Sequence, residues 1–325
     1  MDAPLTEHLA RRAAAAARAA ATAAGRPVVL ARRADATVVR SGGVVAKAHA
    51  PDGDPERLAA RLRIAAHPLL SHVLLAPLTR PAPGDGTGTA GTAEEGALLE
   101  ILPGGRPVSL WPYGVPVDPD APEAAPWEAA GTLLAHLHTV PVAALPGPVP
   151  PARGPAKAAR ALEAMRRAVR PTAASRTIGA AWASLPAQVR ATAPPPHGGG
   201  LCHGDLHLGQ LVRHPAPGGP WRLIDVDDLG LGDPAWDLAR PAAWFAAGLL
   251  PPAAFGRFLD AYRAAGGPAV PGGTEDPWPR LDAPARALTV QMAARALIGA
   301  EAEGRLPDEV ERALLDACAR IAATA

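Results

Sequence analysis

Two polar segments at a fixed spacing constrain the fold of this chain more than any other feature. The first reads HGDLHLGQLV at 203–212 and the second reads WRLIDVDD at 221–228. Gln210 follows Asp205 by five residues, and Asp225 follows it by twenty. Apolar pairs, LV after Gln210 and LI before Asp225, are typical of short strands. The spacing therefore predicts two strands that carry two carboxylates and one amide.

This combination of side chains suits phosphoryl transfer. The reaction needs an acceptor for the proton of the attacking hydroxyl, and a metal ion to neutralise phosphate charge. Asp205 fits the first role, while Gln210 and Asp225 fit the second. Alternatively, His203, Asp205 and His207 alternate along the segment and could bind a hydrolytic metal ion. That interpretation explains neither the second segment nor the spacing.

The same strings resemble those of the aminoglycoside phosphotransferase and choline kinase superfamily. Its usual form is HGDxHxxN, then IDF or IDW, then GDPAxDLA; here the strings are HGDLHLGQ and LIDVDDLGLGDPAWDLA. The Gln in place of Asn is most similar to the maltokinase and glucosamine kinase branch. The resemblance is strong over 201–245 and weaker over 28–70.

The resemblance implies an α+β class and a bilobal protein-kinase-like fold. A small N-terminal lobe with an antiparallel sheet, residues 1–110, would bind the nucleotide. A larger, mostly helical C-terminal lobe, residues 111–325, would carry catalysis and the acceptor. The implied cofactors are ATP and Mg²⁺.

The resemblance also implies roles for individual residues. Asp205 would position or deprotonate the acceptor hydroxyl, and His203 would lock the loop by hydrogen bonding. Gln210 and Asp225 would hold magnesium, with Asp227 as a further metal ligand.

A meander of three strands is predicted near the N-terminus, at 28–33, 37–40 and 44–49. Gly42-Gly43 supplies the positive φ that a tight hairpin needs. Lys47 lies in VVAKA, the position of the strand lysine that pairs with the α- and β-phosphates. An ordinary strand lysine pointing to water is the alternative.

The helix predicted after this meander covers 54–70, with Asp54 as its N-cap. Glu56 is its only acid and is the expected partner of Lys47. A carboxylate in the first turn is also favoured by the helix dipole, whatever its catalytic role.

The run RPVSLWPYGVPV at 106–117 resembles the last strand of a small kinase lobe followed by a hinge. Backbone groups around Leu110 to Gly114 would face the adenine, and Trp111 or Tyr113 would line that slot. Packing between lobes is the alternative for Trp111. The Gly- and Thr-rich insert at 81–96 predicts a mobile loop.

The C-terminal part predicts a set of helices. In GDPAWDLA, Asp233 is expected to cap a helix, and the resemblance makes Asp237 structural, bonding the catalytic loop from below. The other predicted helices are 126–141, 155–170, 175–192, 252–266, 281–303 and 307–323.

Bulk properties exclude several classes. The net charge is +1 and no basic run occurs, so we expect no nucleic-acid partner. The two cysteines give no disulfide framework, which fits a reducing cytoplasm. No run of 18 apolar residues predicts a membrane span. Arginines interrupt the Ala-rich segment at 6–25, which favours an amphipathic helix over a signal peptide. A monomer or homodimer is expected.

The predicted function is an ATP- and Mg²⁺-dependent kinase acting on a small-molecule hydroxyl acceptor: a sugar, an aminosugar or an aminoglycoside-like compound. Gln210 favours a sugar or aminosugar. An aminoglycoside acceptor would want a dense acidic wall, and Glu301, Glu303, Asp308 and Glu309 form only a modest one. The alternatives are a kinase acting on a peptide Ser or Thr in natural-product maturation, and a nucleotide-binding pseudokinase.

Overall fold

The computed structural model describes residues 3–22, 25–33, 35–79, 97–190 and 199–324. The insert at 81–96, predicted as a mobile loop, lies outside the described residues. None of the described helices combines the length and apolarity that crossing a bilayer requires.

The chain forms two compact units, which we call the sheet unit and the helical unit. The sheet unit comprises Met1–Val117, Ala144–Pro150 and Gly209–Asp227, and the helical unit comprises Asp118–Ala143, Pro151–Leu208 and Asp228–Ala325. The boundary predicted at 110/111 treated each lobe as one continuous stretch. The structure differs because the segment from Gly209 to Asp227 returns to the sheet unit.

Five antiparallel strands make the main sheet of the sheet unit, in the order β1-β2-β3-β5-β4. They are β1 (Val28–Arg32), β2 (Thr37–Ser41), β3 (Val44–Ala48), β4 (Glu100–Ile101) and β5 (Pro107–Pro112). The first three confirm the predicted meander.

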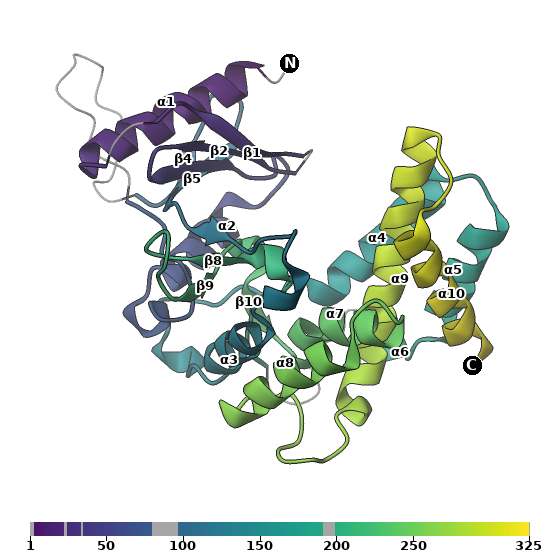
Figure 1. Ribbon diagram of the computed structural model, residues 1–325. Helices are drawn as coiled ribbons and strands as arrows, with labels where there is room; N and C mark the ends of the chain where they lie inside the picture. The colour runs from purple at the N-terminus through teal and green to yellow at the C-terminus, as the bar shows by residue number, and fades with distance from the viewer. Residues whose placement is uncertain (1–2, 23–24, 34, 80–96, 191–198, 325) are drawn as a thin grey trace. The chain divides into compact units, whose positions relative to one another are not determined.

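Helix α1 (Ala3–Ala19) covers one face of this sheet, as Figure 1 shows. Its buried side chains, among them Leu9 and Ala13, pack against Val39, Ala46 and Leu110 of the strands. The predicted N-terminal helix is therefore present and begins at Ala3. Because successive strand residues alternate in direction, Lys47 points to the opposite face from Ala46.

Helix α2 (Pro55–Ala65) follows the meander, and Asp54 caps it as predicted by accepting from the backbone N–H groups of Glu56 and Arg57. A second, three-stranded sheet has the order β6-β8-β9. Its strands are β6 (Val115–Pro116), β8 (Leu211–Arg213) and β9 (Trp221–Leu223). Short 3₁₀ turns occur at Pro68–Leu70, Pro122–Ala124, Val142–Ala144, Leu208–Gln210 and Val226–Asp228.

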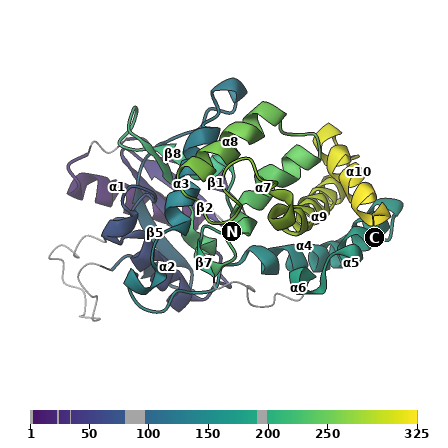
Figure 2. The same cartoon turned by 90° about the horizontal axis from the view of Figure 1, so that it is seen from below.

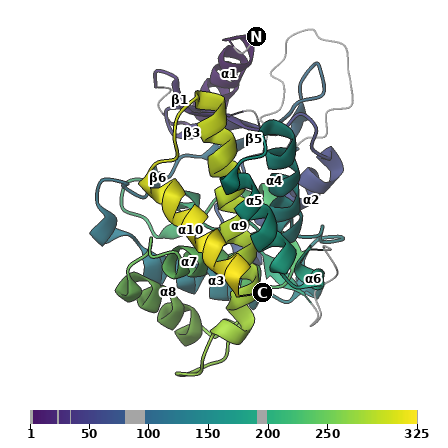
Figure 3. The same cartoon turned by 90° about the vertical axis from the view of Figure 1, so that its right-hand side faces the viewer.

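The helical unit has the long helix α9 at its centre. This helix packs against α4, α5, α7 and α10, and Figures 2 and 3 show these neighbours around it. The helices are α3 (Trp127–His138), α4 (Gly154–Ala168), α5 (Ala173–Ser184), α6 (Ala187–Arg190), α7 (Ala235–Ala246), α8 (Pro252–Ala264), α9 (Trp278–Glu303) and α10 (Glu309–Ala323). They lie where the sequence pattern placed helices, except that the single helix predicted at 175–192 is divided into α5 and α6.

Two further features position the loop between His203 and Asp205. The short strands β7 (Gly200–Cys202) and β10 (Gly230–Gly232) pair antiparallel on either side of it in the sequence. Helix α3 packs tightly on α8, because a Cβ atom at Gly131 would lie 2.2 Å from the Phe258 carbonyl oxygen. This close approach fixes the position of α3. The last residue of α3, His138, contacts Asp237, the side chain that holds the loop.

Candidate active site

A buried carboxylate anchors the loop that follows β7. Asp237, in the first turn of α7, is 2 % exposed and accepts from the backbone N–H groups of His203 (2.6 Å) and Gly204 (2.7 Å). Gly204 has a φ of +84°, and a Cβ atom there would lie 2.4 Å from the Asp228 carbonyl oxygen. Only glycine fits this position. Asp237 thus occupies the supporting position that the resemblance implies, and the fully buried His203 is held through its backbone.

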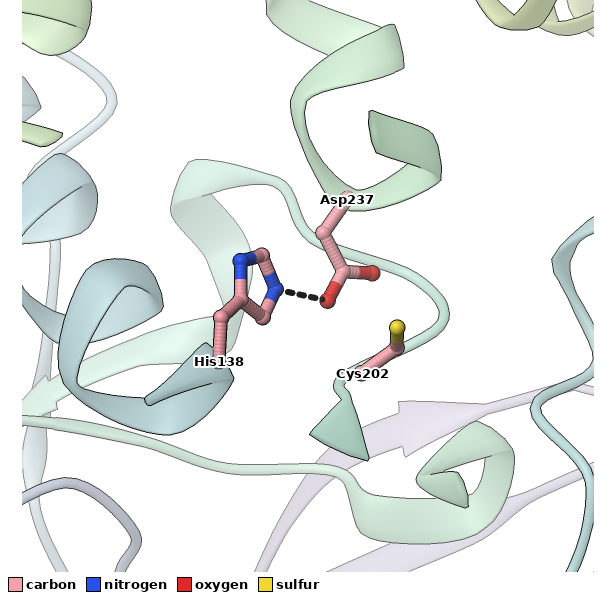
Figure 4. A group of neighbouring side chains, drawn as sticks. All are labelled: His138, Cys202 and Asp237. Atoms are coloured by element: carbon pink, nitrogen blue, oxygen red, sulfur yellow. Dashed lines mark hydrogen bonds and ion pairs between the residues drawn. The ribbon is translucent and has the colours of Figure 1, made fainter. Parts of the chain in front are cut away.

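His138 completes this support, as Figure 4 shows. Its Nε2 lies 3.0 Å from Asp237 Oδ2 and its Nδ1 lies 2.8 Å from the Tyr262 hydroxyl. Burial opposes ionisation of Asp237, but hydrogen bonding to His138 and the loop amides outweighs it and lowers the pKa of this carboxyl. The sequence analysis missed this role of His138.

Cys202 approaches the same carboxylate, so His138, Cys202 and Asp237 have the proximity of a metal site. Burial raises the pKa of the Cys202 thiol well above its usual value. Both His138 nitrogens already have partners. The group therefore fits a structural role.

Asp205 itself lies between two cations of the helical unit. Its Oδ1 accepts from Arg240 Nη2 (2.6 Å) and its Oδ2 from Lys157 Nζ (2.8 Å). Burial opposes ionisation, but these two charges outweigh it and hold the pKa of Asp205 well below its usual range. Asp205 is therefore ionised at any physiological pH.

Lys157 binds a second carboxylate as well. Its Nζ lies 2.5 Å from Asp228 Oδ2, and Arg153 Nε lies 3.3 Å from Asp228 Oδ1. Sequence reasoning missed Lys157, although one signal was available. Lys47 and Lys157 are the chain's only lysines, whereas arginine occurs 30 times (32 Lys and Arg together, less two Lys). Each lysine contacts two aspartates of the motif segments.

Lys47 forms the matching cluster in the sheet unit. Its Nζ lies 2.7 Å from Asp225 Oδ1 and 2.9 Å from Asp227 Oδ1. Burial alone would lower the pKa of Lys47, but the two carboxylates outweigh burial and raise it. The expectation that Lys47 reaches Asp225 is met, and Lys47 does not point to water.

Asp227 is the anchor of a longer hydrogen-bonded chain. His49 Nδ1 lies 3.0 Å from both Asp227 oxygens, and His49 Nε2 lies 2.7 Å from Ser109 Oγ. Ser109 Oγ also accepts from Trp111 Nε1 at 2.7 Å. Lys47 and His49 hold the pKa of Asp227 well below its usual range despite its burial. Lys47 and His49 engage both its oxygens, so Asp227 orients Lys47 in this structure, and its role as a metal ligand stays a prediction.

Gln210 and Asp225 offer a better oxygen pair for a metal ion. Gln210 Nε2 donates to Asp225 Oδ2 at 3.3 Å, which leaves the amide oxygen of Gln210 for a cation. Asp225 adopts a φ of +65°, a conformation that costs energy for residues other than glycine. A carboxylate and an amide oxygen are the donors that Mg²⁺ prefers. The residues present therefore fit a magnesium ion.

Three predicted nucleotide contacts are not supported by the geometry. Glu56 is exposed in the first turn of α2, and the carboxylate partners of Lys47 are Asp225 and Asp227. The Leu110 carbonyl accepts from the Leu78 N–H, and its side chain packs against α1. The N–H and C=O groups of Tyr113 are bonded to Gly43 and His214.

Trp111 remains beside the Lys47 cluster. In the β3–β5 register Ser109 lies opposite Lys47 and Trp111 opposite Val45, so both side chains share the face of Lys47. The Trp111 ring is buried in the sheet unit and holds Ser109 in place for His49.

Comparison with solved structures shows the kinase-like fold. A choline/ethanolamine kinase family protein from Mesorhizobium loti matches with a TM-score of 0.54 and 18 % identity, over 98 % of this chain and 94 % of that one. Amicoumacin kinase in complex with AMP-PNP, Ca²⁺ and Ami matches with a TM-score of 0.60 and 15 % identity, over 95 % of this chain and 92 % of that one. A thermostable mutant of an aminoglycoside phosphotransferase, in complex with AMP-PNP and hygromycin B, matches with a TM-score of 0.58 and 13 % identity, over 93 % of this chain and 95 % of that one.

A search of curated proteins gives no match. The family model described as "Phosphotransferase enzyme family" matches residues 55–283, which is more than half of the chain and includes Asp205, Gln210 and Asp225. The chain therefore belongs to the phosphotransferase enzyme family.

Proposed function

We propose that this protein is an ATP- and magnesium-dependent kinase that phosphorylates a hydroxyl group of a small molecule. The observation that carries the proposal is the Lys47 cluster. A buried lysine lies between two aspartates, and one of these, Asp225, also contacts the amide of Gln210. This arrangement provides one cation for phosphate oxygens and an oxygen pair for a metal ion.

On the nucleotide side, Lys47 would contact the α- and β-phosphates while Asp227 and His49 hold its position. Asp225 and the Gln210 amide oxygen would hold Mg²⁺, with Trp111 near the nucleotide on the same face of the sheet. Magnesium, when bound, supplies positive charge to the β- and γ-phosphate oxygens. One lysine against two aspartates leaves a net negative charge, which favours a cation at this cluster.

On the acceptor side, Asp205 would orient the attacking hydroxyl. The hydroxyl oxygen forms a bond to the γ-phosphorus, the bond to the β–γ bridging oxygen breaks, and ADP leaves. The hydroxyl proton passes to the Asp205 carboxylate. A carboxylate with so low a pKa is a weak base, so its main contribution is orientation, which suits a loose transition state.

Relatives of the same fold support this proposal. Amicoumacin kinase was solved with AMP-PNP and Ca²⁺, and spectinomycin phosphotransferase was solved with ADP and spectinomycin. Gln210, which resembles the maltokinase and glucosamine kinase branch, favours a sugar-like acceptor. The alternating metal site His203-Asp205-His207 gains no support, because Lys157 and Arg240 already neutralise Asp205.

The test is ADP release from MgATP in the presence of sugars, aminosugars, antibiotics and amino alcohols. We expect at least one acceptor to stimulate ADP release, with loss of the signal after chelation of magnesium. Asp225→Asn serves as the matched control, since it keeps the size of the side chain and removes its charge. Absence of MgATP binding in the wild-type protein would contradict the proposal.

A further inference from the structure

A continuous hydrogen-bonded chain runs along one face of the main sheet, from Trp111 to Lys47. Trp111 Nε1 donates to Ser109 Oγ (2.7 Å), and Ser109 Oγ lies 2.7 Å from His49 Nε2. His49 Nδ1 lies 3.0 Å from both oxygens of Asp227, and Asp227 Oδ1 accepts from Lys47 Nζ at 2.9 Å. All five residues belong to the sheet unit. The chain therefore joins a tryptophan of β5 to the lysine of β3 within one compact unit.

The register of β3 and β5 brings these side chains to one face. Ser109 lies opposite Lys47, and the ladder continues through the His49 N–H group, which donates to the Pro107 carbonyl at 2.9 Å. His49 follows Lys47 by two residues and therefore points to the same face. His49, Ser109 and Trp111 are all buried, so their polar groups depend on one another rather than on water.

The donors and acceptors of the chain fit together in one direction. An ionised carboxylate can only accept, so His49 Nδ1 carries the proton that faces Asp227. The indole N–H of Trp111 can only donate, so Ser109 Oγ accepts it. The hydroxyl proton of Ser109 then points to His49 Nε2, which accepts in this tautomer. Each polar side-chain group of the three buried residues has a partner, and a fully paired buried network is rigid.

The two carboxylates that contact Lys47 differ in their second partners. Asp225 also contacts the Gln210 amide, and the proposed function assigns this pair to magnesium. Asp227 instead has His49 on its other side. When Asp225 faces a metal ion, Asp227 is the carboxylate that still holds the ammonium. Because the lysine stem is flexible, its ammonium needs such a fixed partner to stay in one position.

Helix α2 does not supply this partner. Glu56, the only acid of α2, is exposed, and the carboxylates in contact with Lys47 are Asp225 and Asp227. Asp227 is held by His49, which the strand ladder fixes. The position of the Lys47 ammonium therefore depends on the sheet and not on the placement of α2.

We propose that His49 and Ser109 are positioning residues of the kinase, which act through Asp227 to hold the Lys47 ammonium in place for the phosphates of the nucleotide. This inference rests on the proposed function and deepens it. Ordering the lysine before the nucleotide binds removes an entropic cost from binding. Loss of the chain should therefore weaken nucleotide binding even where the fold is intact.

The first experiment measures nucleotide affinity in Ser109→Ala. This change removes the hydroxyl that joins Trp111 to His49. It leaves Lys47 and Asp227 unaltered. Calorimetric titration of the full-length protein with AMP-PNP and magnesium should show an affinity about 3- to 10-fold lower than in the wild type, the effect of one lost hydrogen bond. Unchanged affinity in a folded Ser109→Ala protein would overturn the inference.

Ser41→Ala is the matched control. Ser41 is also buried in the main sheet, and its hydroxyl donates to the Gly25 carbonyl at 2.9 Å. It pairs with Val44 in the register of β2 and β3, so its side chain lies on the face that α1 covers. Ser41→Ala should bind AMP-PNP as the wild-type protein does. An equal loss of nucleotide affinity in Ser41→Ala and Ser109→Ala would show a general effect on the sheet and contradict the inference.

The second experiment compares His49→Leu with His49→Asn. Leucine removes both hydrogen bonds of the imidazole, one of them to a charged group, so AMP-PNP affinity should fall about 10- to 100-fold. Asparagine keeps an N–H donor near the position of Nδ1 and should recover part of this loss. Equal losses in the two variants would mean that the ring only fills space, against the inference.

Magnesium affinity separates this role from metal binding. At saturating AMP-PNP, the apparent affinity for magnesium should be the same in His49→Leu and in the wild-type protein, because the chain acts on Lys47. A loss of magnesium affinity greater than the loss of AMP-PNP affinity would mean that His49 holds Asp227 for the metal ion, and would overturn the inference.

The third experiment repeats both changes in Lys47→Met. If His49 and Ser109 act through Lys47, neither Ser109→Ala nor His49→Leu should lower AMP-PNP affinity further by more than about twofold, the limit of additivity for independent sites. Losses that multiply with that of Lys47→Met would show a role independent of the lysine and contradict the inference.

Failure of the inference is distinct from failure of the proposed function. If the wild-type protein does not bind AMP-PNP with magnesium, the kinase proposal is wrong and the inference falls with it. If the wild-type protein binds and Ser109→Ala binds equally well, only the inference is wrong.

Discussion

In each of the two lysine clusters of this protein, one lysine contacts two aspartates, but the net charges of the two clusters are opposite. In the sheet unit, Lys47 contacts Asp225 and Asp227; in the helical unit, Lys157 contacts Asp205 and Asp228. The Lys47 cluster also contains the Gln210 amide and the His49 imidazole, and it has an excess of negative charge. The Lys157 cluster adds two arginines and has an excess of positive charge.

This difference indicates that the two clusters have different roles. A cluster with excess negative charge attracts a metal ion, which in turn brings phosphate. A cluster with excess positive charge keeps Asp205 ionised. The lysine ammonium is a compact charge on a flexible stem, so it can bind two carboxylates at once. The planar guanidinium of arginine would bind the same two carboxylates in a different geometry. That preference accounts for two lysines in a chain otherwise rich in arginine.

The largest effect is expected from Asp205→Asn. The fold and nucleotide binding should stay nearly intact, while turnover falls on the order of 10²–10⁴-fold, the range for a positioned acid or base. Steady-state kinetics with a nucleotide titration on the same protein checks this. Turnover like that of the wild type would remove Asp205 from the catalytic role.

The second prediction compares Asp225→Ala with Gln210→Ala. Asp225→Ala should weaken magnesium-dependent nucleotide binding by more than about 100-fold, since even outer-sphere partners contribute 10–100-fold to metal affinity. Gln210→Ala should weaken it less, because an amide supplies only a dipole. Titration of magnesium at constant AMP-PNP measures both. A greater loss in Gln210→Ala would reverse the metal assignment.

The third prediction concerns the helical unit. Lys157→Met removes a charge-assisted hydrogen bond to Asp205, so turnover should fall about 10- to 100-fold. Lys157→Arg should recover only part of the loss, because the guanidinium cannot reproduce the contacts of a compact ammonium to both aspartates. Full activity in Lys157→Met would reduce this cluster to a surface ion pair.

The smallest effect is expected from Glu56→Ala. Glu56 is exposed, so its loss should cost less than about 1 kcal/mol of stability, mainly from the helix dipole. The KM for MgATP should not change. A strong rise in that KM would show that Glu56 pairs with Lys47 during the reaction, contrary to the static geometry.

Much of the fold was predictable because its patterns are local. The meander, the Asp54 cap and the helices follow from hairpin glycines, capping residues and periodicity. The sites were only partly predictable. Motif spacing identified Asp205, Gln210 and Asp225, but Lys157 comes from a helix far away in sequence and carries no local motif. Leu110 was misassigned because neither the pairing with Leu78 nor the packing of α1 can be seen in a single strand.

The most direct test of these different roles is calorimetric titration of AMP-PNP with magnesium into the wild-type protein, Lys47→Met and Lys157→Met. Lys47 is assigned to phosphate, so Lys47→Met should lose at least about tenfold in nucleotide affinity, the effect of a lost charged hydrogen bond. Lys157 is assigned to the acceptor side, so Lys157→Met should bind the nucleotide as the wild-type protein does. Equal loss of affinity in both variants, or loss only in Lys157→Met, would contradict the account.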